Sequence, residues 1–280
     1  MGRVKGVIVA AGYGTRFLPV TRVVPKELLP IVNRPALAYV VDEMAEAGIE
    51  EVLVITSRRK RAIEDWFDTD VELEHRKGRE ALGIPNVRAT FVRQHEMKGT
   101  GHALLMAETF AAGAPFVVAF PDDLFGAPNC SAQLIATWER TGCSVLACGD
   151  LTGRDVSRYG VVDASDDNGV LRVRRIVEKP AAGTEPSHLV SWGRYLYTAE
   201  VFEALHAGMR SHSGTGEFYA TDAINALAAQ QRMTATVSAA PRYDTGQPLG
   251  YLTTIVELGL QHPEVGPAFA AWMRQRFGPR

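Results

Sequence analysis

Residues 10–30 read AAGYGTRFLPVTRVVPKELLP and follow directly on the short apolar run Val7-Ile8-Val9. This pattern predicts a buried strand that ends in a loop of small residues. The glycines of the loop, Gly12 and Gly14, allow backbone N–H groups to come close to an anion. The stretch therefore favours an α/β fold with an anion-binding loop, although a glycine-rich turn after a strand is also common as a plain connection.

Two cations lie in the same stretch. Arg16 and Lys26 stand ten positions apart, and Pro19 and Pro25 stiffen the path between them. Basic side chains beside a loop of N–H groups can neutralise a multiply charged ligand, and a polyphosphate fits this loop best. The alternative is incidental surface charge without a ligand.

The composition is that of an ordinary globular protein. The chain has 280 residues, 46% of them hydrophobic, which is enough for one large α/β domain or two small ones. The formal net charge of −2 gives no global attraction to nucleic acid or to an anionic membrane, so phosphate binding has to be local. The three cysteines lack metal-ligand spacing and suit a reducing compartment. No stretch approaches the ~20 apolar residues of a membrane span, so we expect a cytoplasmic protein.

Short apolar runs alternate with helical patterns through the first half of the chain. Such alternation predicts a largely parallel sheet with helices on both faces, and ligands of such sheets bind at the carboxyl ends of the strands. In the second half, a hairpin across residues 166–169 and a longer strand replace this pattern. Strands are expected at 4–9, 52–56, 87–92, 116–120, 144–148, 161–163, 170–177, 188–197 and 234–238, and helices at 35–48, 59–67, 71–82, 101–112, 131–141, 199–205, 221–229, 247–261 and 265–277.

An acidic pair follows one of the expected strands. Asp122 and Asp123 come directly after residues 116–120 and Pro121. Neighbouring side chains of an extended chain point to opposite sides, so we expect one carboxylate to face a cleft and the other to support the backbone. Mg²⁺ binds one or two carboxylates together with phosphate oxygens and water, which makes Asp122 a candidate ligand. Asp244 is the candidate second ligand, and each acid has the alternative interpretation of a solvated turn residue.

Three further segments offer groups for a ligand but are weak signals alone. The Gln94 amide combines a donor and an acceptor, as the imide edge of uracil or thymine requires, and Gly99 could add a backbone contact. Glu178 and Lys179 end an expected strand and could bind a sugar phosphate, while Gly160 could let a ligand approach the backbone. Each of these residues has the common structural alternative of an exposed loop or strand end.

The order and spacing of the motifs resemble those of a known family. From about Val4 to Pro263 the chain closely resembles the bacterial UTP–glucose-1-phosphate uridylyltransferases. The PKELLP motif is specific for sugar-nucleotide pyrophosphorylases, and the RAIEDWFD and GHA segments favour the uridylyl over the thymidylyl branch. The motifs are, in order, AAGYGTRFLPVT, PKELLPIVNRPALAYVVDE, RRKRAIEDWFD, VRQHEMKGTGHAL, FPDDL, YGVVD, EKP, GRYLYT, GEFYATDAI and YDTGQPLGYL.

The resemblance implies a Rossmann-like nucleotidyltransferase fold of the GT-A-like kind. This is an α/β three-layer sandwich with a mixed, mainly parallel central sheet and a small additional β region. One domain would span about residues 1–265, with a nucleotide-binding half over about 1–150 and a sugar-binding half over about 151–265. Residues 266–280 would form a C-terminal helix that covers the body's own core or contacts a neighbouring subunit. Because the family is commonly oligomeric, a homodimer or homotetramer is expected.

The resemblance also assigns roles to the candidate residues. It implies Mg²⁺-dependent transfer of a uridylyl group from UTP to glucose 1-phosphate. The catalytic residues would be Arg16, Lys26, Asp122 and Lys179, and the Mg²⁺ ligands Asp122 and Asp244. The nucleotide would be bound by Ala10, Ala11, Gly12, Gly14, Thr15, Gln94 and Gly99. The sugar phosphate would be bound by Gly160, Glu178, Lys179, Glu217 and Thr221.

The chain departs from the family pattern at several positions. Arg22 replaces the usual lysine and keeps its charge, while Trp192 and Tyr219 stand where aliphatic or polar residues are usual. Both aromatic residues could reshape the sugar pocket. The identity of the hexose therefore stays open at this point, and the nearest alternative is a thymidylyl- or uridylyltransferase acting on a different hexose 1-phosphate.

Two other classes of protein are disfavoured. A catalytically silent nucleotide-sugar binding subunit would be expected to lose Arg16, Lys26 or Asp122, and all three are present. A dinucleotide-dependent oxidoreductase would need a third glycine where Phe17 stands.

Overall fold

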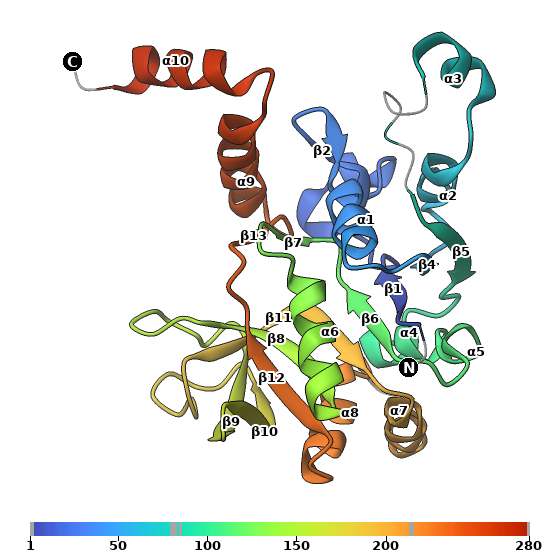
Figure 1. Ribbon diagram of the computed structural model, residues 1–280, viewed down its shortest axis with the longest axis vertical. Helices are drawn as coiled ribbons and strands as arrows, with labels where there is room; N and C mark the ends of the chain where they lie inside the picture. The colour runs from blue at the N-terminus through green and yellow to red at the C-terminus, as the bar shows by residue number, and fades with distance from the viewer. Residues whose placement is uncertain (1–2, 79–82, 84–85, 213–215, 279–280) are drawn as a thin grey trace.

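The computed structural model describes residues 3–78, 83, 86–212 and 216–278. This part of the chain forms a sheet of nine strands: β1 Lys5–Val9, β4 Glu51–Thr56, β5 Arg88–Arg93, β6 Phe116–Ala119, β8 Ser144–Asp150, β9 Gly160–Asp167, β10 Val170–Glu178, β11 Leu189–Tyr197 and β12 Met233–Val237. Their order in the sheet is β5-β4-β1-β6-β11-β8-β12-β10-β9 (Figure 1).

The two halves of the chain pair differently within this sheet. Strands β5, β4, β1 and β6 are parallel, so their carboxyl ends share one edge, as the alternation in sequence predicts. Strand β11 enters between β6 and β8 in the opposite direction. Strand β12 is parallel to β8, and β10 is antiparallel to both β12 and β9. The sheet is therefore mixed, with less parallel pairing in its second half than the alternation suggests.

Helices cover both faces of the sheet. The helices of the described residues are α1 Ala36–Glu46, α2 Arg61–Phe67, α3 Val71–Lys77, α4 Thr100–Leu105, α5 Glu108–Ala111, α6 Cys130–Thr141, α7 Glu200–Ser211, α8 Ala220–Ala229, α9 Pro248–Gln261 and α10 Gly266–Phe277. Helices α4, α7 and α8 contact one another over one face, and α1 and α6 contact each other over the other face. Val7 packs into the first of these cores and its neighbour Ile8 into the second. Strand β1 is thus buried on both sides, which explains its continuous apolar sequence.

Most expected elements are present with small shifts at their ends. The helix expected at 101–112 is instead two short helices, α4 and α5. The helix expected at 199–205 continues to Ser211. Helix α3 ends at Lys77, and residues 79–82 of the helix expected there lie outside the described residues.

The small additional β region consists of two short pairings. Strand β2 (Pro30–Ile31) pairs with β3 (Arg34–Pro35), and β7 (Asp123–Phe125) pairs with β13 (Arg242–Asp244). In the second pairing Asp244 lies directly opposite Asp123. Two acidic segments far apart in the chain are thereby fixed side by side.

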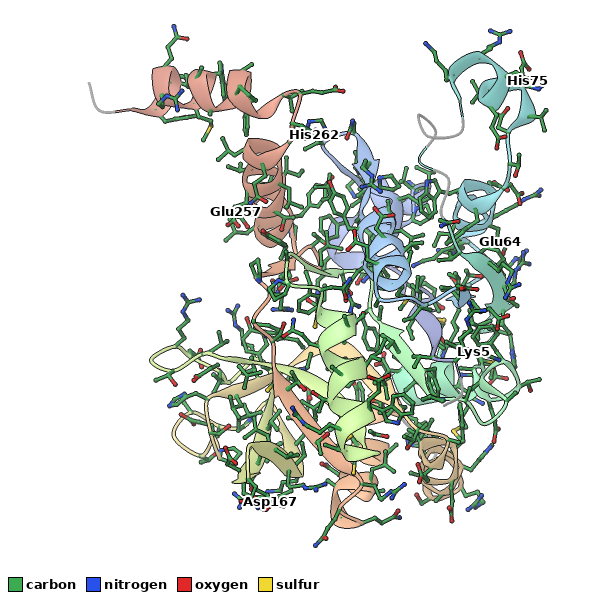
Figure 2. All side chains as sticks on the ribbon, viewed as in Figure 1. Lys5, Glu64, His75, Asp167, Glu257 and His262 are labelled. Carbon is green, nitrogen blue, oxygen red and sulfur yellow. The ribbon has the colours of Figure 1, made fainter. Side chains whose placement is uncertain are left out.

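The C-terminal helix α10 extends away from the sheet (Figure 1). It leaves α9 at a bend marked by His262, whose Nδ1 accepts a hydrogen bond from the backbone N–H of Glu264 at 3.2 Å (Figure 2). Trp272 is 51% exposed and Phe277 is 65% exposed. The helix therefore does not cover the body's own core. No helix of the described residues has both the length and the apolar character to cross a bilayer.

Candidate active site

Two neighbouring cavities open at the carboxyl ends of the first strands. The loop cavity, of about 470 Å³, is lined by the loop that follows β1 and by the segment that follows β5. The hairpin cavity, of about 320 Å³, is lined by residues of the β9–β10 hairpin, of β11 and of the segment around β13. Phe120 and Asp122 line both cavities. The two cavities thus meet where the acidic pair follows β6, at the edge predicted from the alternation of strands and helices.

The loop that follows β1 folds back on itself through three short 3₁₀ turns, Thr15–Phe17, Val20–Arg22 and Lys26–Leu28. Gly14 has a φ of 67°, in the left-handed region that favours glycine. Its carbonyl accepts a hydrogen bond from Thr21 Oγ1 at 2.8 Å. A Cβ at Gly14 would lie only 3.4 Å from Cβ of Lys26. This turn therefore brings Lys26 back beside the start of the loop.

Lys26 and Asp122 form an ion pair at the junction of the two cavities. Lys26 Nζ lies 2.5 Å from Asp122 Oδ2, and both side chains are largely buried. Burial favours the neutral form of each group, but the attraction between opposite charges outweighs it. The Asp122 and Glu27 carboxylates raise the pKa of Lys26. Lys26 and, more weakly, Arg16 lower the pKa of Asp122. Both groups are therefore charged near neutral pH.

Asp123 supports the backbone, as expected for the second member of the acidic pair. Its Oδ2 accepts a hydrogen bond from the backbone N–H of Gly193 at 2.8 Å, and its Oδ1 accepts one from Arg242 Nε at 2.8 Å. A Cβ at position 193 would lie 2.3 Å from Asp123 Oδ2, so only glycine permits this contact. Burial, together with the nearby carboxylates of Asp122 and Asp244, raises the pKa of Asp123 despite its pairing with Arg242.

The carboxylates of Asp122 and Asp244 bound a small space over Gly246. A Cβ added at Gly246 would lie 3.0 Å from Asp122 Oδ2 and 3.2 Å from Asp244 Oδ1. The backbone N–H of Thr245 donates to the carbonyl of Asp122 at 2.8 Å and holds the two segments together. Two carboxylate oxygens around such a space suit Mg²⁺, whose remaining ligands are commonly phosphate and water. The described residues contain no group of three or more His, Cys, Asp or Glu side chains that could hold a metal ion.

Arg16 lies apart from Lys26, although both belong to the same loop. Its guanidinium lines the hairpin cavity, where Nη1 donates to the carbonyl of Gly246 at 3.3 Å. Lys26 lines the loop cavity. The two cations therefore line different cavities, because the turn at residues 15–17 directs Arg16 towards Gly246 beside β13. Both cations still act on the Asp122 carboxylate and lower its pKa.

The Gln94 amide is buried at the base of the loop cavity, with 4% of its surface exposed. Its Nε2 donates to the carbonyl of Gly99 at 3.0 Å and lies 3.1 Å from His102 Nδ1. A carbonyl only accepts, so the amino group of Gln94 must face Gly99, and its second N–H points to a neutral His102. Both N–H groups are then in use, and Oε1 alone is left for a ligand. This corrects the expectation that Gln94 presents a donor and an acceptor together.

The residues expected to bind the nucleotide divide into two sets. Those that line the loop cavity are Ala11, Gly12, Thr15, Gln94 and Gly99. Ala10 is instead buried in the core at 1% exposure, and its backbone N–H donates to the carbonyl of Ile55. Gly14 shapes the loop without lining the cavity. These two residues therefore support the site without facing it.

The residues expected to bind the sugar phosphate also divide. Gly160, Glu178 and Thr221 line the hairpin cavity. Glu217 lines the loop cavity instead. Lys179 lines neither: its side chain is 69% exposed, and its Nζ lies 4.0 Å from Glu178 Oε1. The cause is local, since Glu178 ends β10 and Lys179 then turns outward with a φ of 47°.

The hairpin cavity contains residues that the sequence did not single out. Arg242 binds Asp123 and lies over the ring of Trp192, with 6.0 Å between its guanidinium carbon and the ring centroid. No sequence motif pointed to Arg242, because the pairing of β13 with β7 that places it beside Asp123 forms only in the folded chain. Trp192 lines the cavity, as its unusual size suggested, whereas Tyr219 is 51% exposed and lines neither cavity.

Comparison with known proteins identifies the family. A family model described as nucleotidyl transferase matches residues 5–259. The chain belongs to the nucleotidyl transferase family. Within it, this nucleotidyl transferase is 40% identical to a UTP–glucose-1-phosphate uridylyltransferase of Staphylococcus epidermidis, over 97% of either chain. It is 39% identical to the enzyme of the same name from Bacillus subtilis, over 96% of this chain and 95% of that one.

Solved structures confirm the fold. This nucleotidyl transferase is similar to a UDP-glucose pyrophosphorylase in complex with UDP-glucose, with a TM-score of 0.84 and 35% identity over 93% of this chain and all of that one. It is also similar to a UTP-bound enzyme from Acinetobacter baumannii, with a TM-score of 0.88 and 33% identity over 98% of this chain and all of that one. The resemblance to the bacterial uridylyltransferases and the predicted fold class are therefore confirmed.

Proposed function

We propose that this protein is a UTP–glucose-1-phosphate uridylyltransferase, which forms UDP-glucose and pyrophosphate from UTP and α-D-glucose 1-phosphate. Relatives at 39–40% identity carry this name, and solved relatives hold UDP-glucose and UTP. The observation that carries the proposal is the meeting of two cavities at Asp122, beside Lys26. A reaction between a nucleotide and a sugar phosphate needs such a pair of sites with one shared point.

The nucleotide fits the loop cavity. Gln94 Oε1 can accept a hydrogen bond from N3–H of uracil, and it would repel the N3 acceptor of cytosine. The backbone of Ala11, Gly12 and Thr15 lies along the path of the phosphates. The α-phosphate would then lie beside Lys26 and Asp122.

The sugar phosphate fits the hairpin cavity. Glu178 offers acceptors for sugar hydroxyls, and a Cβ at Gly160 would lie 3.0 Å from Glu178 Oε2, so glycine keeps that carboxylate accessible. Arg16 in the same cavity can bind the phosphate and direct one of its oxygens towards Asp122. Lys179 can add a second cation from the exposed end of β10.

The reaction proposed is a displacement at the α-phosphorus of UTP. A phosphate oxygen of glucose 1-phosphate forms the new P–O bond, and the bond from the α-phosphorus to the bridging oxygen breaks. Pyrophosphate leaves with that electron pair. A phosphate monoester is already ionised near neutral pH, so the step needs no general base, and the protein contributes orientation and positive charge.

Asp122 and Asp244 would hold Mg²⁺ at the space over Gly246. Bound there, Mg²⁺ would neutralise charge on the phosphate oxygens of both substrates. Lys26, which pairs with Asp122 and lines the loop cavity, would contact the phosphates of the nucleotide. Asp123 and Arg242 keep the two acidic segments in register.

A substrate panel tests this function. The purified protein is incubated with UTP, dTTP or CTP and with a set of hexose 1-phosphates, and pyrophosphate release is measured with Mg²⁺, after EDTA, and after Mg²⁺ is restored. We expect UTP with glucose 1-phosphate to be the best pair, CTP to be rejected, and EDTA to abolish the reaction reversibly. A preference for dTTP or for another hexose would replace the proposal with the corresponding transferase.

A further inference from the structure

An indole ring forms part of the wall of the hairpin cavity. Trp192 lines this cavity together with Gly160 and Glu178, which are placed there for the sugar. It lies in β11 where the pairing with β8 shifts register, between Ser191 and Tyr195. A bulge of this kind redirects the side chains of the strand that carries it. The irregular part of β11 therefore brings the Trp192 ring to the sugar end of the site.

The ring of Trp192 is held in place from several sides. A Cβ at Gly149, on the neighbouring strand β8, would overlap the ring, so only glycine lets the ring lie this close to the strand. The ring of Phe125 lies 5.7 Å from it between centroids, and the guanidinium carbon of Arg242 lies 6.0 Å from its centroid. Arg242 is itself fixed by Asp123, to which its Nε donates at 2.8 Å. Moving the ring would disturb all of these contacts, so this part of the wall is rigid.

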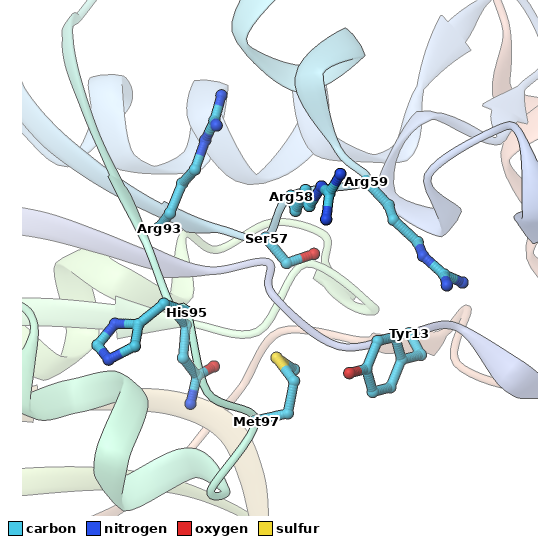
Figure 3. Close-up of a pocket in the computed structure, with 8 residues that line it drawn as sticks. Tyr13, Ser57, Arg58, Arg59, Arg93, His95 and Met97 are labelled. Carbon is cyan, nitrogen blue, oxygen red and sulfur yellow. The ribbon is translucent and has the colours of Figure 1, made fainter.

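A cavity beside the loop cavity has walls of a different kind. This arginine cavity, of about 710 Å³, is lined by Arg58 and Arg59, which follow β4, and by Arg93 at the end of β5 (Figure 3). All three arginines are exposed, and long exposed side chains change rotamer quickly to admit a larger ligand. The hairpin cavity, at about 320 Å³, is less than half as large, and it lies near the lower end of the ~300–1,000 Å³ of ligand pockets. A rigid ring in a small cavity leaves no such freedom.

We propose that Trp192 sets the upper size limit of the sugar in the hairpin cavity, an inference that rests on the proposed function. The ring leaves room for an unsubstituted hexose 1-phosphate and excludes one that is enlarged by a group such as an acetamido or a methoxy group. The hydroxyls of Ser191 and Tyr195, 2.9 Å apart, and the Glu178 carboxylate line the same cavity and can bind sugar hydroxyls. These polar groups select for hydroxyls, whereas Trp192 selects against bulk.

Sugar phosphates that are enlarged at one carbon at a time test this limit. The ratio of kcat/KM for each enlarged sugar to kcat/KM for glucose 1-phosphate is measured with UTP, for N-acetylglucosamine 1-phosphate and for each mono-O-methyl ether of glucose 1-phosphate. In Trp192→Leu at least one of these ratios should rise at least about tenfold, because one carbon more or less in a pocket changes discrimination by about 10–200-fold. The KM for UTP should stay at its wild-type value, since Trp192 does not line the loop cavity.

Two further variants complete the design. Trp192→Phe keeps an aromatic ring beside Phe125 and Arg242 but is smaller, so it should shift the same ratio in the same direction even where Trp192→Leu does not fold. Trp138→Leu makes the matched change at a half-buried tryptophan of α6 that lines neither the loop cavity nor the hairpin cavity. It should keep the wild-type ratios.

The outcomes distinguish the two proposals. Wild-type ratios for every enlarged sugar in the Trp192 variants, or the same change in Trp138→Leu, would overturn the size limit. A wild-type protein that converts no sugar phosphate with UTP would refute the proposed function instead. Calorimetric titration with the same sugars would then decide the limit by itself. A ratio of Kd values that shifts towards an enlarged sugar in Trp192→Leu but not in Trp138→Leu supports it, and an unchanged ratio or an absence of binding overturns it.

Discussion

Asp122 and Asp123 are neighbours in the chain, yet their carboxylates contact different groups. Asp122 faces the junction of the loop and hairpin cavities and pairs with Lys26. Asp123 points to the backbone of Gly193 and to Arg242. The alternation of side chains along an extended segment produces this division. It leaves the first carboxylate at the cavities, where the proposed reaction would use it, and gives the second a supporting role.

Replacing Asp122 with asparagine tests the chemical assignment. The change keeps the size of the side chain but removes the charge that a cation requires, so kcat for UDP-glucose formation should fall at least about 100-fold. The far-UV circular dichroism spectrum should stay unchanged. Asp65→Asn, at a carboxylate that is 60% exposed, serves as the matched control and should keep full activity. Near-normal turnover of Asp122→Asn would remove this residue from the metal site.

His102 fixes the orientation of Gln94 only while its Nδ1 is unprotonated. Burial, together with Lys98 and His95, lowers the pKa of His102 from 6.5, while Glu96 opposes this shift. As the pH falls below about 6.5, the unfolded chain takes up a proton at His102 that the folded protein does not. The free energy of unfolding is therefore highest above this pH and decreases below it.

A titration of stability tests this role of His102. Urea unfolding between about pH 5 and 7.5 should show a shallower pH dependence in His102→Asn than in wild type, because asparagine keeps an acceptor for Gln94 but does not titrate. His75→Asn, on the exposed surface of α3, should retain the wild-type slope (Figure 2). Identical slopes for His102→Asn and wild type would contradict the proposed proton uptake.

At the scale of elements, a buried ion pair ties β11 to two helices. Arg194 is fully buried, and its Nη2 lies 2.6 Å from Glu43 Oε2 on α1. Glu43 Oε1 also accepts from Ser131 Oγ, in the first turn of α6, at 2.6 Å. Arg194 Nη2 donates to the carbonyl of Asp123 at 3.2 Å. The pair therefore connects the helices of one face to the acidic segment of the site.

Arg194→Met should lower the free energy of unfolding by about 3–5 kcal/mol, because it leaves the Glu43 carboxylate buried without its partner. Urea or thermal unfolding measures the loss. Adding Glu43→Leu should recover part of it, since the unpaired charge is then gone. Arg76→Met breaks an exposed ion pair with Glu72 and should change the midpoint of unfolding little. A similar loss of stability in Arg194→Met and in Arg76→Met would show that burial of the Arg194 pair is unimportant.

At the scale of the whole molecule, α10 has aromatic side chains that packing against the rest of the chain leaves exposed. Its rings pack on one another, with 6.0 Å between the centroids of Phe269 and Trp272 and 5.7 Å between those of Trp272 and Phe277. Trp272 and Phe277 nevertheless stay largely exposed on a helix that extends from the sheet (Figure 1). Exposed apolar groups of this kind favour contact with another protein surface, and we expect a second copy of the chain.

Light scattering after size exclusion tests this expectation. The wild-type protein should have a mass that is a multiple of 30.5 kDa, and the double variant Trp272→Ser, Phe277→Ser should have a lower mass with an unchanged Tm. Val71→Ser removes an exposed apolar side chain from α3 and should leave the mass unchanged. A mass of 30.5 kDa for the wild-type protein would contradict the expected oligomer.

The sequence predicted those features that depend on near neighbours in the chain. Alternating patterns located the parallel strands, and the glycines after β1 located the loop cavity. The position of Asp122 after a strand placed it at the correct edge of the sheet. These predictions succeeded because side-chain periodicity and turn formation are properties of a few consecutive residues.

Only the tertiary structure decided which of these segments meet. Asp244 reaches Asp122 because β13 pairs with β7, and Arg16 is separated from Lys26 because its loop turns towards that pairing. The single acceptor that Gln94 offers follows from its contacts with Gly99 and His102. Such contacts join residues whose spacing in sequence carries no periodic signal. They are set by the packing of the whole sheet and its helices, which no short stretch of the chain determines by itself.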